Sequence, residues 1–279
     1  MTPVSLEEDI ARHYGTGGLL DRIRAGLRQA GIDPDRAGPA DLKPVDEFHI
    51  GGAAATEALL GQAALRPDMA VLDIGCGIGG TTRLIAERVG ARVTGIDLTE
   101  EFVATARALS ETVGLEDRTE FRTGSAIAMP FEDDSFDAAL LLHVGMNIAD
   151  KRALMTEVAR VLRPGAPFLV YEVMRTGEGE LDFPVPWAST PATSFVATPQ
   201  EYREAARAAG FEVAQERERR DFALDFFAKI QARIAESGPP PLGIHLLMGE
   251  TAREKIANTV ANIKAGRIAP VEMILRAPQ

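Results

Sequence analysis

The chain has 279 residues, of which 46% are hydrophobic, and a formal net charge of −11 at pH 7. Its length and apolar content suit one large core, while the acidic balance argues against a nucleic-acid substrate, which requires a basic surface. The single cysteine excludes an internal disulfide and a cysteine-based zinc cluster, so no metal site is expected. Residues 1–9 are acidic and lack the apolar stretch of a signal peptide, and no apolar run is long enough to span a membrane. We therefore expect a cytoplasmic protein that does not bind membranes.

The N-terminal segment 1–65 precedes the first predicted core strand. Apolar residues recur at helical spacing over 19–27, and Gly31 ends this helix. The stretch 33–44 is rich in Pro, Gly and Asp and is predicted as a loop. A second helix is expected near 53–65. This segment is interpreted as a helical cap.

A strand, a glycine-rich turn and a helix follow in immediate succession. Residues 70–74 form an apolar strand that contains Asp73, and the turn 75–80 leads into the helix. Glycines permit positive φ angles and a close approach of the backbone to a ligand, and a helix N-terminus attracts anions. The next strand, 93–97, ends at Asp97, whose carboxylate can accept hydrogen bonds from both hydroxyls of a ribose. This arrangement predicts a nucleoside-binding site.

The glycines alone leave the nucleoside undetermined. Gly75, Gly77 and Gly80 satisfy the pattern G-x-G-x-x-G, which is also typical of dinucleotide sites. A nicotinamide-dependent oxidoreductase would require a second mononucleotide-binding half and a Tyr-x-x-x-Lys or equivalent, and we find neither. Residues 71–79, Val-Leu-Asp-Ile-Gly-Cys-Gly-Ile-Gly, resemble motif I of the class I S-adenosylmethionine-dependent methyltransferases, which carries an acid at the position of Asp73. The resemblance implies S-adenosyl-L-methionine as the cofactor and S-adenosyl-L-homocysteine as its product.

Helices and strands then alternate as in a parallel α/β sheet. A helix is expected over about 99–113, and strands are predicted at 119–123, 136–142 and 168–173. No internal repeat interrupts this order. After residue 173 the alternation breaks, which indicates a change from the sheet to an accessory part.

Residues 175–197 contain several prolines and are predicted as a long loop. Thr198 and Glu201 have the spacing of a capping box and mark the start of the next helix. A strand is expected near 211–217. The mixed charges of 216–221 favour a solvated face.

Residues 222–265 carry an apolar helical stripe and a further helix, and a last strand is expected near 268–275. A strand that arrives after a helical insertion matches the α/β, Rossmann-like fold of the class I methyltransferases. This fold has a mostly parallel seven-stranded sheet with an antiparallel last strand, here with a helical cap. The predicted parts are an N-terminal cap segment (1–65), an S-adenosylmethionine-binding core (66–221), a cap insertion (222–265) and the last core strand (266–279).

Other stretches extend the resemblance. Residues 124–137 are similar to the motif around the fourth strand of small-molecule methyltransferases, and residues 160–165 to the turn that follows. Residues 47–51 and 262–267 are similar to the sarcosine/dimethylglycine and phosphoethanolamine N-methyltransferases. The resemblance implies methylation of a small-molecule metabolite, with an amine as first candidate and O- or C-methylation of a natural-product or quinone-like acceptor as the alternative. A cofactor-binding protein without turnover is the non-enzymatic alternative. We expect a monomer or homodimer.

Four positions depart from the family pattern. Ser125 stands where many members carry an acid, so the adenine amino group must find another partner. Leu142 and His143 replace the Gln-Asp or Arg-Asp pair of those N-methyltransferases, and Asn147 replaces the histidine of the phosphoethanolamine enzymes. These departures separate the chain from the acceptor and the catalytic dyad of those relatives.

The resemblance implies distinct roles along the motifs. Asp73 and the glycines would anchor the methionine part of the cofactor, Asp97 the ribose, and Ser125 with Ala126 the adenine edge. The full set of predicted cofactor-binding residues is Asp73, Gly75, Cys76, Gly77, Gly79, Asp97, Leu98, Ser125, Ala126, Leu142 and His143.

The candidate catalytic residues are His143 and Glu172, near the carboxyl ends of the strands 136–142 and 168–173, where ligands of open α/β sheets bind. His143 fits a pocket wall equally well, and Glu172 fits a buried hydrogen-bonding acid. A sulfonium methyl needs mainly alignment, and a base is required only if the acceptor arrives protonated. The predicted substrate-contacting residues are Tyr14, His49, Met146, Trp187, Phe226 and Phe227. Segments 1–50, 177–197 and 222–265 are expected to form a lid over the acceptor.

Overall fold

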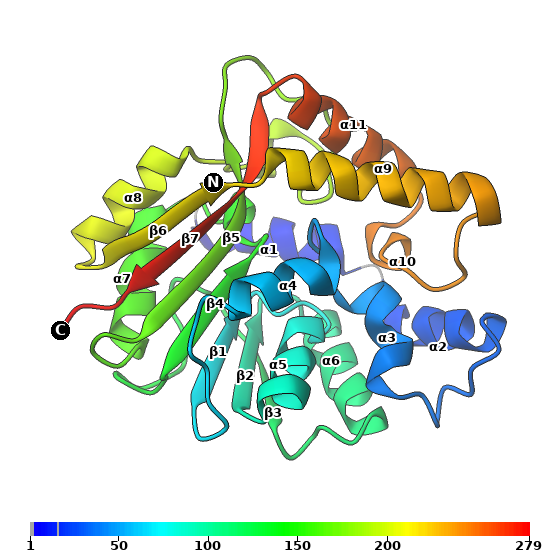
Figure 1. Cartoon of the computed structure of the whole chain (residues 1–279), viewed down its shortest axis with the longest axis horizontal. Coiled ribbons are helices and arrows are strands. Elements are labelled where there is room, and N and C mark those ends of the chain that lie inside the picture. Colours follow the sequence, from blue (N-terminus) through cyan, green and yellow to red (C-terminus); the bar gives the residue numbers. More distant parts are fainter. Residues whose placement is uncertain (1–2, 16) are drawn as a thin grey trace.

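The computed structural model describes residues 3–15 and 17–279, so that residues 1, 2 and 16 of the predicted cap lie outside the described residues. Its core is a seven-stranded sheet in the order β3-β2-β1-β4-β5-β7-β6 (Figure 1). The strands are β1 (Ala70–Ile74), β2 (Arg92–Asp97), β3 (Thr119–Thr123), β4 (Ala138–Leu142), β5 (Pro167–Arg175), β6 (Glu212–Glu218) and β7 (Ile268–Arg276). Only β7 runs antiparallel to its neighbours. The predicted class I methyltransferase fold is confirmed.

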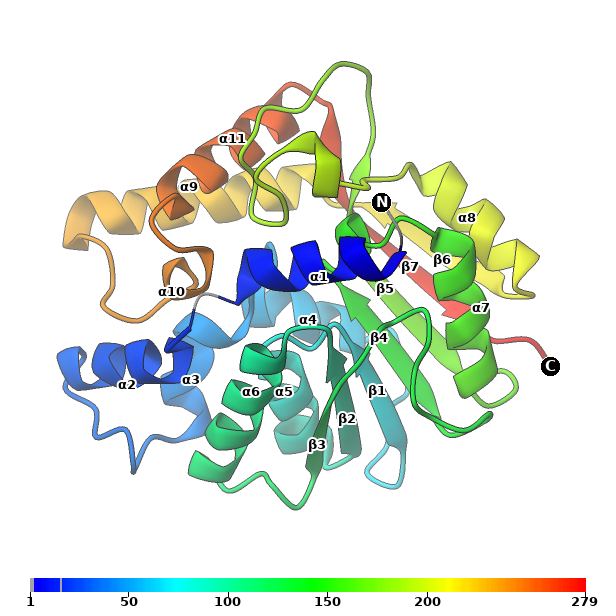
Figure 2. The same ribbon diagram turned by 180° about the vertical axis from the view of Figure 1, so that it is seen from behind.

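Helices cover both faces of the sheet (Figures 1 and 2). The α-helices are α1 (Pro3–Tyr14), α2 (Leu19–Gln29), α3 (Pro39–Asp46), α4 (Gly52–Leu60), α5 (Gly80–Val89), α6 (Glu100–Thr112), α7 (Lys151–Val161), α8 (Pro199–Ala208), α9 (Arg220–Ser237), α10 (His245–Met248) and α11 (Ala252–Lys264). Two short 3₁₀ turns are η1 (Gly145–Asn147) and η2 (Pro191–Thr193). Residues of α7 and α8 pack on one face, and residues of α4 and α5 on the other.

The central strands explain why the sheet is rigid where the ligand site begins. Every residue of β4 is buried, and so is every residue of β5 except Arg175. Burial on both faces is typical of the central strands of a parallel sheet, and each fully buried aliphatic side chain contributes about 1.5–3 kcal/mol. The carboxyl ends of these strands are therefore held in fixed positions.

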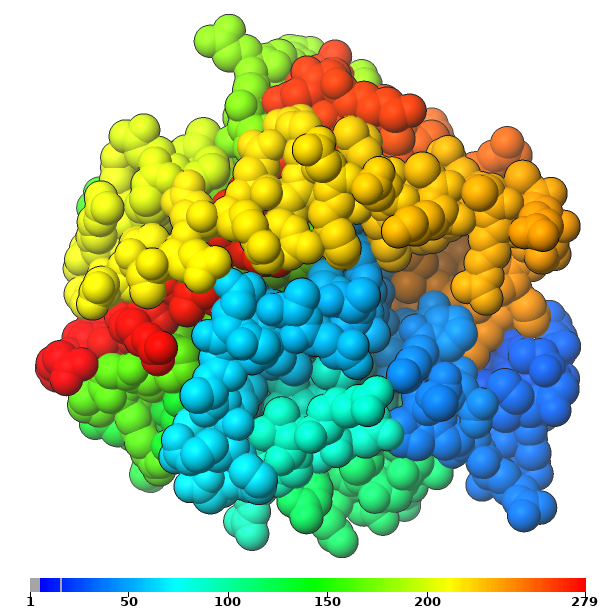
Figure 3. Space-filling model, in the orientation of Figure 1, coloured from blue at the N-terminus to red at the C-terminus, as the bar shows by residue number. Residues whose placement is uncertain are grey.

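The cap lies over that edge of the sheet. It consists of α1–α3, the loop 176–197, and α9–α11 (Figure 2). The side-chain amide of Asn262 accepts the main-chain N–H of Asp182 and donates to its carbonyl, both at 3.0 Å, and Asn258 donates to the Pro184 carbonyl at 3.0 Å. These bonds fix the loop to α11. On the outer surface, the cap leaves a hollow between α9 and α3 (Figure 3).

Two elements differ from the sequence prediction. The stretch 33–44, predicted as a loop, contains most of α3, which begins with Pro39 at a position that favours proline and buries Leu42 and Val45 against α2. Its short apolar stripe is decided by tertiary packing, which overrides the loop-like composition. Helix α1 was not predicted at all, and its buried Ile10 lines the cavity that lies between the sheet and the cap.

The charged run 216–221 is only partly a solvated face. Glu216, Arg217 and Glu218 are exposed as predicted. However, Arg217 donates to the buried carboxylate of Glu272 at 2.6 Å, and Arg219 also donates to Glu272. A buried carboxylate requires such partners, so part of this run neutralises an internal charge.

Among the described helices, none is both long and apolar enough to cross a bilayer.

Candidate cofactor and acceptor site

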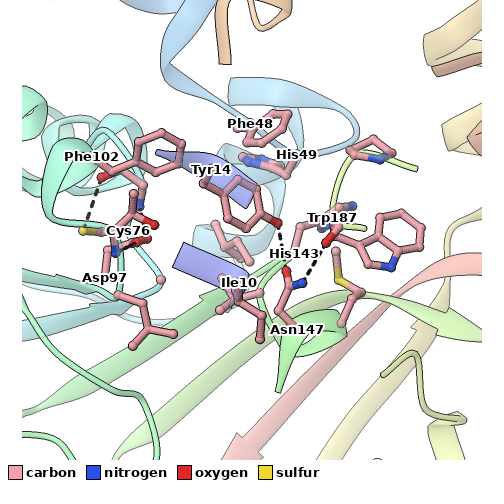
Figure 4. A pocket seen from close by; sticks show the side chains of 18 of the residues that line it. Ile10, Tyr14, Phe48, His49, Cys76, Asp97, Phe102, His143, Asn147 and Trp187 are labelled. Atoms are coloured by element: carbon pink, nitrogen blue, oxygen red, sulfur yellow. Dashed lines mark hydrogen bonds between the residues drawn. The ribbon is translucent and has the colours of Figure 1, made fainter. Parts of the chain in front are cut away.

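A cavity of about 460 Å³ lies between the sheet and the cap. It is located at the carboxyl ends of β1, β2 and β4, where the strand order reverses direction, which is the usual ligand position in open α/β sheets. Figure 4 shows Asp97 and Cys76 at one end, His143, Asn147 and Trp187 at the other, and Tyr14 between them. We call the Asp97 end the donor half and the Trp187 end the acceptor half.

The glycine turn shapes the donor half. Gly75 has φ +71°, and a Cβ there would lie 2.2 Å from a methyl group of Val144, so that no side chain fits. The N–H groups of Gly75 and Cys76 both donate to the Ile96 carbonyl, at 2.7 and 3.1 Å, which ties the turn to β2. Gly77 has φ +54°, but a Cβ there would meet no protein atom within 4 Å. Gly77 therefore borders open cavity space.

Two carboxylates flank this turn. Asp73 is buried and accepts the Thr82 hydroxyl at 2.6 Å, and burial raises its pKa to about 7. Asp97 accepts the N–H of Gly77 on one oxygen at 2.9 Å and that of Thr99 on the other at 2.8 Å. A carboxylate oxygen can accept two hydrogen bonds, so each oxygen retains capacity for a ribose hydroxyl. Burial raises the pKa of Asp97 as well.

A residue of the N-terminal helix contacts the segment that follows β3. Ser125 and Ala126 line the cavity as predicted. The Ser125 hydroxyl donates to the carboxylate of Glu7 at 2.5 Å, and Glu7 is a residue of α1 that also lines the cavity. Sequence reasoning missed Glu7, because the two residues are separated by 118 positions and no motif surrounds Glu7.

His143 lines the acceptor half, and its backbone and ring are both held by hydrogen bonds to the protein. Its φ of +57° is unusual for a residue with a side chain. The Tyr171 carbonyl accepts both its main-chain N–H at 2.8 Å and its ring Nδ1–H at 3.0 Å, which leaves the Nε2 lone pair facing the Ile50 N–H at 3.4 Å. Burial lowers the pKa of His143 to about 3. The ring is therefore neutral and a poor proton acceptor.

His49 belongs to a second buried network. Its Nε2 contacts the Thr56 hydroxyl at 3.0 Å, and its Nδ1 lies 3.4 Å from the Glu47 carboxylate. Glu47, which the sequence did not single out, accepts the hydroxyls of Thr56 and Thr81, each at 3.1 Å. Burial lowers the pKa of His49 to about 4 and raises that of Glu47. Both polar atoms of the His49 ring thus already have partners in the protein.

Two predicted site residues do not line the cavity. Successive side chains of a strand point to opposite faces, so Val173 faces the cavity and Glu172 does not. Glu172 is fully buried and accepts the Val144 N–H at 2.9 Å, and burial raises its pKa to about 8. Gly79 caps α5 with φ +82°, and a Cβ there would meet the ring of Phe121 at 2.7 Å. Both residues support the site from behind.

The remaining predicted residues all line the cavity. In the donor half, the lining includes Leu98 and Leu142, which lies at the end of β4. The six predicted substrate-contacting residues also line the cavity: Tyr14, His49, Met146, Trp187, Phe226 and Phe227. They come from α1, the α3–α4 connection, η1, the loop 176–197 and α9. In the described part of the chain, every charged side chain that lines the cavity is a carboxylate: Glu7, Asp46, Asp73, Asp97 and Asp150.

Asn147 joins the parts of the acceptor half. The Tyr14 hydroxyl donates to its side-chain oxygen at 2.8 Å. Its amide nitrogen donates to the carbonyls of Trp187 at 2.8 Å and Thr193 at 3.3 Å. Asn147 therefore connects α1 with the loop 176–197.

The remaining two histidines of the chain have packing roles. His13 contacts the Pro186 carbonyl at 3.1 Å, and His245 is half-buried on α10.

Comparison with known proteins agrees with this geometry. Residues 72–170 match the family model described as "Methyltransferase domain". The chain is 40% identical over 112 residues to a sterol 24-C-methyltransferase of Gibberella zeae (40% of this chain, 30% of that protein). It is 33% identical over 174 residues to a probable chloroplastic tocopherol O-methyltransferase of Oryza sativa subsp. japonica (60% of this chain, 47% of that protein). The chain thus spans less than half the length of each of these two curated relatives.

A solved structure extends the similarity to the whole chain. The geranyl diphosphate C-methyltransferase from Streptomyces coelicolor A3(2) superposes with a TM-score of 0.72 at 18% identity, covering 99% of this chain and 98% of that one. By their names, these relatives methylate carbon or oxygen, and other matches are N-methyltransferases, so the matches do not single out the N-methyltransferases that the sequence resembles. Together with the fold, this match shows that residues 72–170 form a methyltransferase domain within a sheet of the class I methyltransferase type.

Proposed function

We propose that the whole chain transfers a methyl group from S-adenosylmethionine to oxygen or carbon of an uncharged, largely apolar small molecule. The donor half fits this cofactor. Gly77 borders open space, Asp97 has free acceptor capacity for a ribose diol, and the carboxylates favour a cationic sulfonium. We assign Asp73, Gly75, Cys76, Gly77, Leu98 and Asp97 to this site.

The acceptor half carries the choice of substrate. Aromatic and aliphatic side chains line most of it, including Met146, Trp187, Phe226 and Phe227. Its polar side chains are largely occupied, because Asn147 and both histidines bond to other protein groups. Binding of an acceptor here is therefore driven by removal of apolar surface from water, which contributes about 25 cal/mol per Å².

Charge argues against the acceptors of the N-methyltransferases that the sequence resembles. Sarcosine, dimethylglycine and phosphoethanolamine each carry an anionic group. Among the described residues, the cavity lining holds no lysine or arginine that could pair with the anionic group of such an acceptor. The O- or C-methylation alternative is therefore the better supported one.

The protein's own part in the reaction is alignment and exclusion of water. S-Adenosylmethionine supplies an activated methyl group, and holding an acceptor atom about 3 Å away in line with the sulfonium accounts for much of the rate. His143 and His49 are held neutral with pKa values lowered by burial, so they orient and enclose the acceptor rather than take its proton. The cap segments, through Tyr14, Trp187 and Phe227, exclude water from the cationic donor.

The first test concerns the cofactor. S-Adenosylmethionine and S-adenosylhomocysteine are expected to raise the melting temperature, since ligands that bind only the native state stabilise it, while NAD and NADP are not. The second test incubates the protein with isotope-labelled donor and two panels. One holds terpenoids, polyketides, sterols and quinols; the other holds sarcosine and phosphoethanolamine. A labelled methyl group on a compound of the first panel supports the proposal, and a methylated product from the second panel alone contradicts it.

A further inference from the structure

The inference concerns how the cofactor's base is recognised, and it rests on the proposed function. In the sheet order β3-β2-β1, the glycine turn follows β1 and the ribose-binding Asp97 ends β2. A nucleoside anchored in this way extends its base toward the end of β3. The cavity wall there is apolar and suits a purine ring: Leu98, Phe102, Ala126 and Ile127.

Few polar side chains face this end. Thr99 is buried, and its main-chain N–H donates to Asp97. The Ser125 hydroxyl donates its single hydrogen to the Glu7 carboxylate at 2.5 Å. Glu7 lines the same wall from α1, which lies across the carboxyl edge of the sheet (Figure 2). The bond from Ser125 uses one of about four lone-pair sites of this carboxylate and fixes its orientation. No further hydrogen bond reaches this carboxylate from the described residues, so its other lone-pair sites can accept from a ligand.

An adenine ring places a hydrogen-bond donor, its 6-amino group, at the edge remote from the ribose. A carboxylate that accepts such a group forms a charge-assisted hydrogen bond, which is stronger than one between neutral groups. We propose that Glu7 accepts the 6-amino group of the adenine and thereby selects an adenosyl cofactor. In this chain the acid that the core position Ser125 lacks is supplied by the N-terminal helix.

This assignment links donor binding to the acceptor half. Glu7 and Tyr14 belong to the same helix, about 10 Å apart along its axis. Tyr14 is bonded to Asn147, which holds the loop that carries Trp187. A cofactor that binds Glu7 therefore docks α1, and with it one wall of the acceptor half.

Calorimetry with two ligands tests the contact. S-Inosylhomocysteine differs from S-adenosylhomocysteine in carrying a 6-oxo group, which would face the Glu7 carboxylate as a second acceptor. The wild-type protein is expected to prefer S-adenosylhomocysteine by on the order of 10- to 100-fold. In Glu7→Ala this preference should disappear, and in Glu7→Gln it should shrink, because an amide can donate to the 6-oxo group. Glu8→Ala, an exposed neighbour on α1, is the matched control and should keep the wild-type preference.

A rescue experiment separates recognition from simple docking. In Glu7→Ala with Ser125→Asp, the acid returns to the core, so preference for S-adenosylhomocysteine should recover. Amide hydrogen exchange of α1 should slow on adding S-adenosylhomocysteine to the wild type and not in this double variant. If Glu7→Ala weakens both ligands equally, Glu7 only docks the helix and the inference is overturned. If wild-type protein binds neither ligand, the proposed function itself fails.

Discussion

The two halves of the cavity are built in opposite ways. The donor half is formed mainly by residues 73–126, whose backbone hydrogen bonds fix the glycine turn and Asp97 before any ligand arrives. The acceptor half is assembled from side chains of α1, η1, the loop 176–197 and α9, which are distant in sequence and joined through Asn147. The first is a short local motif, and the second is a product of how the cap folds over the sheet.

This difference separates the two kinds of specificity. A backbone-defined site presents the same groups whatever the surrounding side chains, so it suits a cofactor common to a family. A side-chain-defined cavity changes with every substitution in the cap, so it suits an acceptor that varies. Substitutions in the donor half should therefore abolish binding of the cofactor, and those on α9, which lies away from the α1 contact with Ser125, should change only binding of the acceptor.

The largest effect is expected from Gly75→Ala. A Cβ here would lie 2.2 Å from Val144 at a φ of +71°, so the turn must move, and binding of S-adenosylhomocysteine should fall by more than about 100-fold with a lower melting temperature. Gly77→Ala is the matched control. It shares a positive φ but meets no protein atom, so it should weaken the ligand by filling donor space while the melting temperature changes less. Equal losses of stability would contradict this distinction.

Asp97→Ala tests the proposed ribose contact. Its carboxylate is already oriented by Gly77 and Thr99, and two charge-assisted hydrogen bonds to the diol are worth a few kcal/mol. We expect an approximately 100-fold rise in the dissociation constant of S-adenosylhomocysteine, measured by calorimetry. Asp97→Asn, which keeps one oxygen acceptor, should lose less. Unchanged affinity in Asp97→Ala would remove Asp97 from the donor site.

Phe226→Ala tests whether the cap selects the acceptor. Phe226 lines the cavity from α9, and loss of its ring removes aromatic contact worth about 1–2 kcal/mol. With an acceptor found in the panel, KM for that acceptor should rise about 10-fold, while the dissociation constant of S-adenosylhomocysteine stays unchanged. Ile234→Ala changes an exposed residue of the same helix and should affect neither. Weaker binding of S-adenosylhomocysteine in Phe226→Ala would mean that α9 also contributes to the donor half.

The smallest effect concerns Glu172 behind the site. Burial raises its pKa from 4.5 to about 8, so the folded protein holds a proton that the unfolded chain releases between these values. Its contribution to stability is complete below pH 4.5 and is lost as the pH rises toward 8, with a slope of up to about 1.4 kcal/mol per pH unit. Urea unfolding of Glu172→Gln from pH 7 to 8 should show a flatter decline than wild type, and the histidines titrate alike in both proteins. Glu178→Gln, at an exposed position, should retain the wild-type slope.

Local patterns predicted most of the core. The strand, glycine turn and helix from 70 to 89 occur as expected, because a continuous apolar run and the need for positive φ leave clear marks in a sequence. The capping box is also confirmed: Thr198 accepts the Glu201 N–H at 3.2 Å, and Glu201 accepts the Thr198 N–H at 2.7 Å. Each of these features is decided by residues a few positions apart.

The sequence by itself therefore determined the fold class and the donor motif of this protein, since those depend on periodicity and backbone freedom. Only the tertiary structure decided which face Glu172 occupies, that α3 forms within a loop-like stretch, and that Glu7 reaches Ser125. A side chain's direction at the end of a strand depends on register, and the position of a cap helix depends on packing across more than a hundred residues. Neither leaves a local pattern, so the acceptor half and the Glu7 contact became visible only when the cap was placed on the sheet.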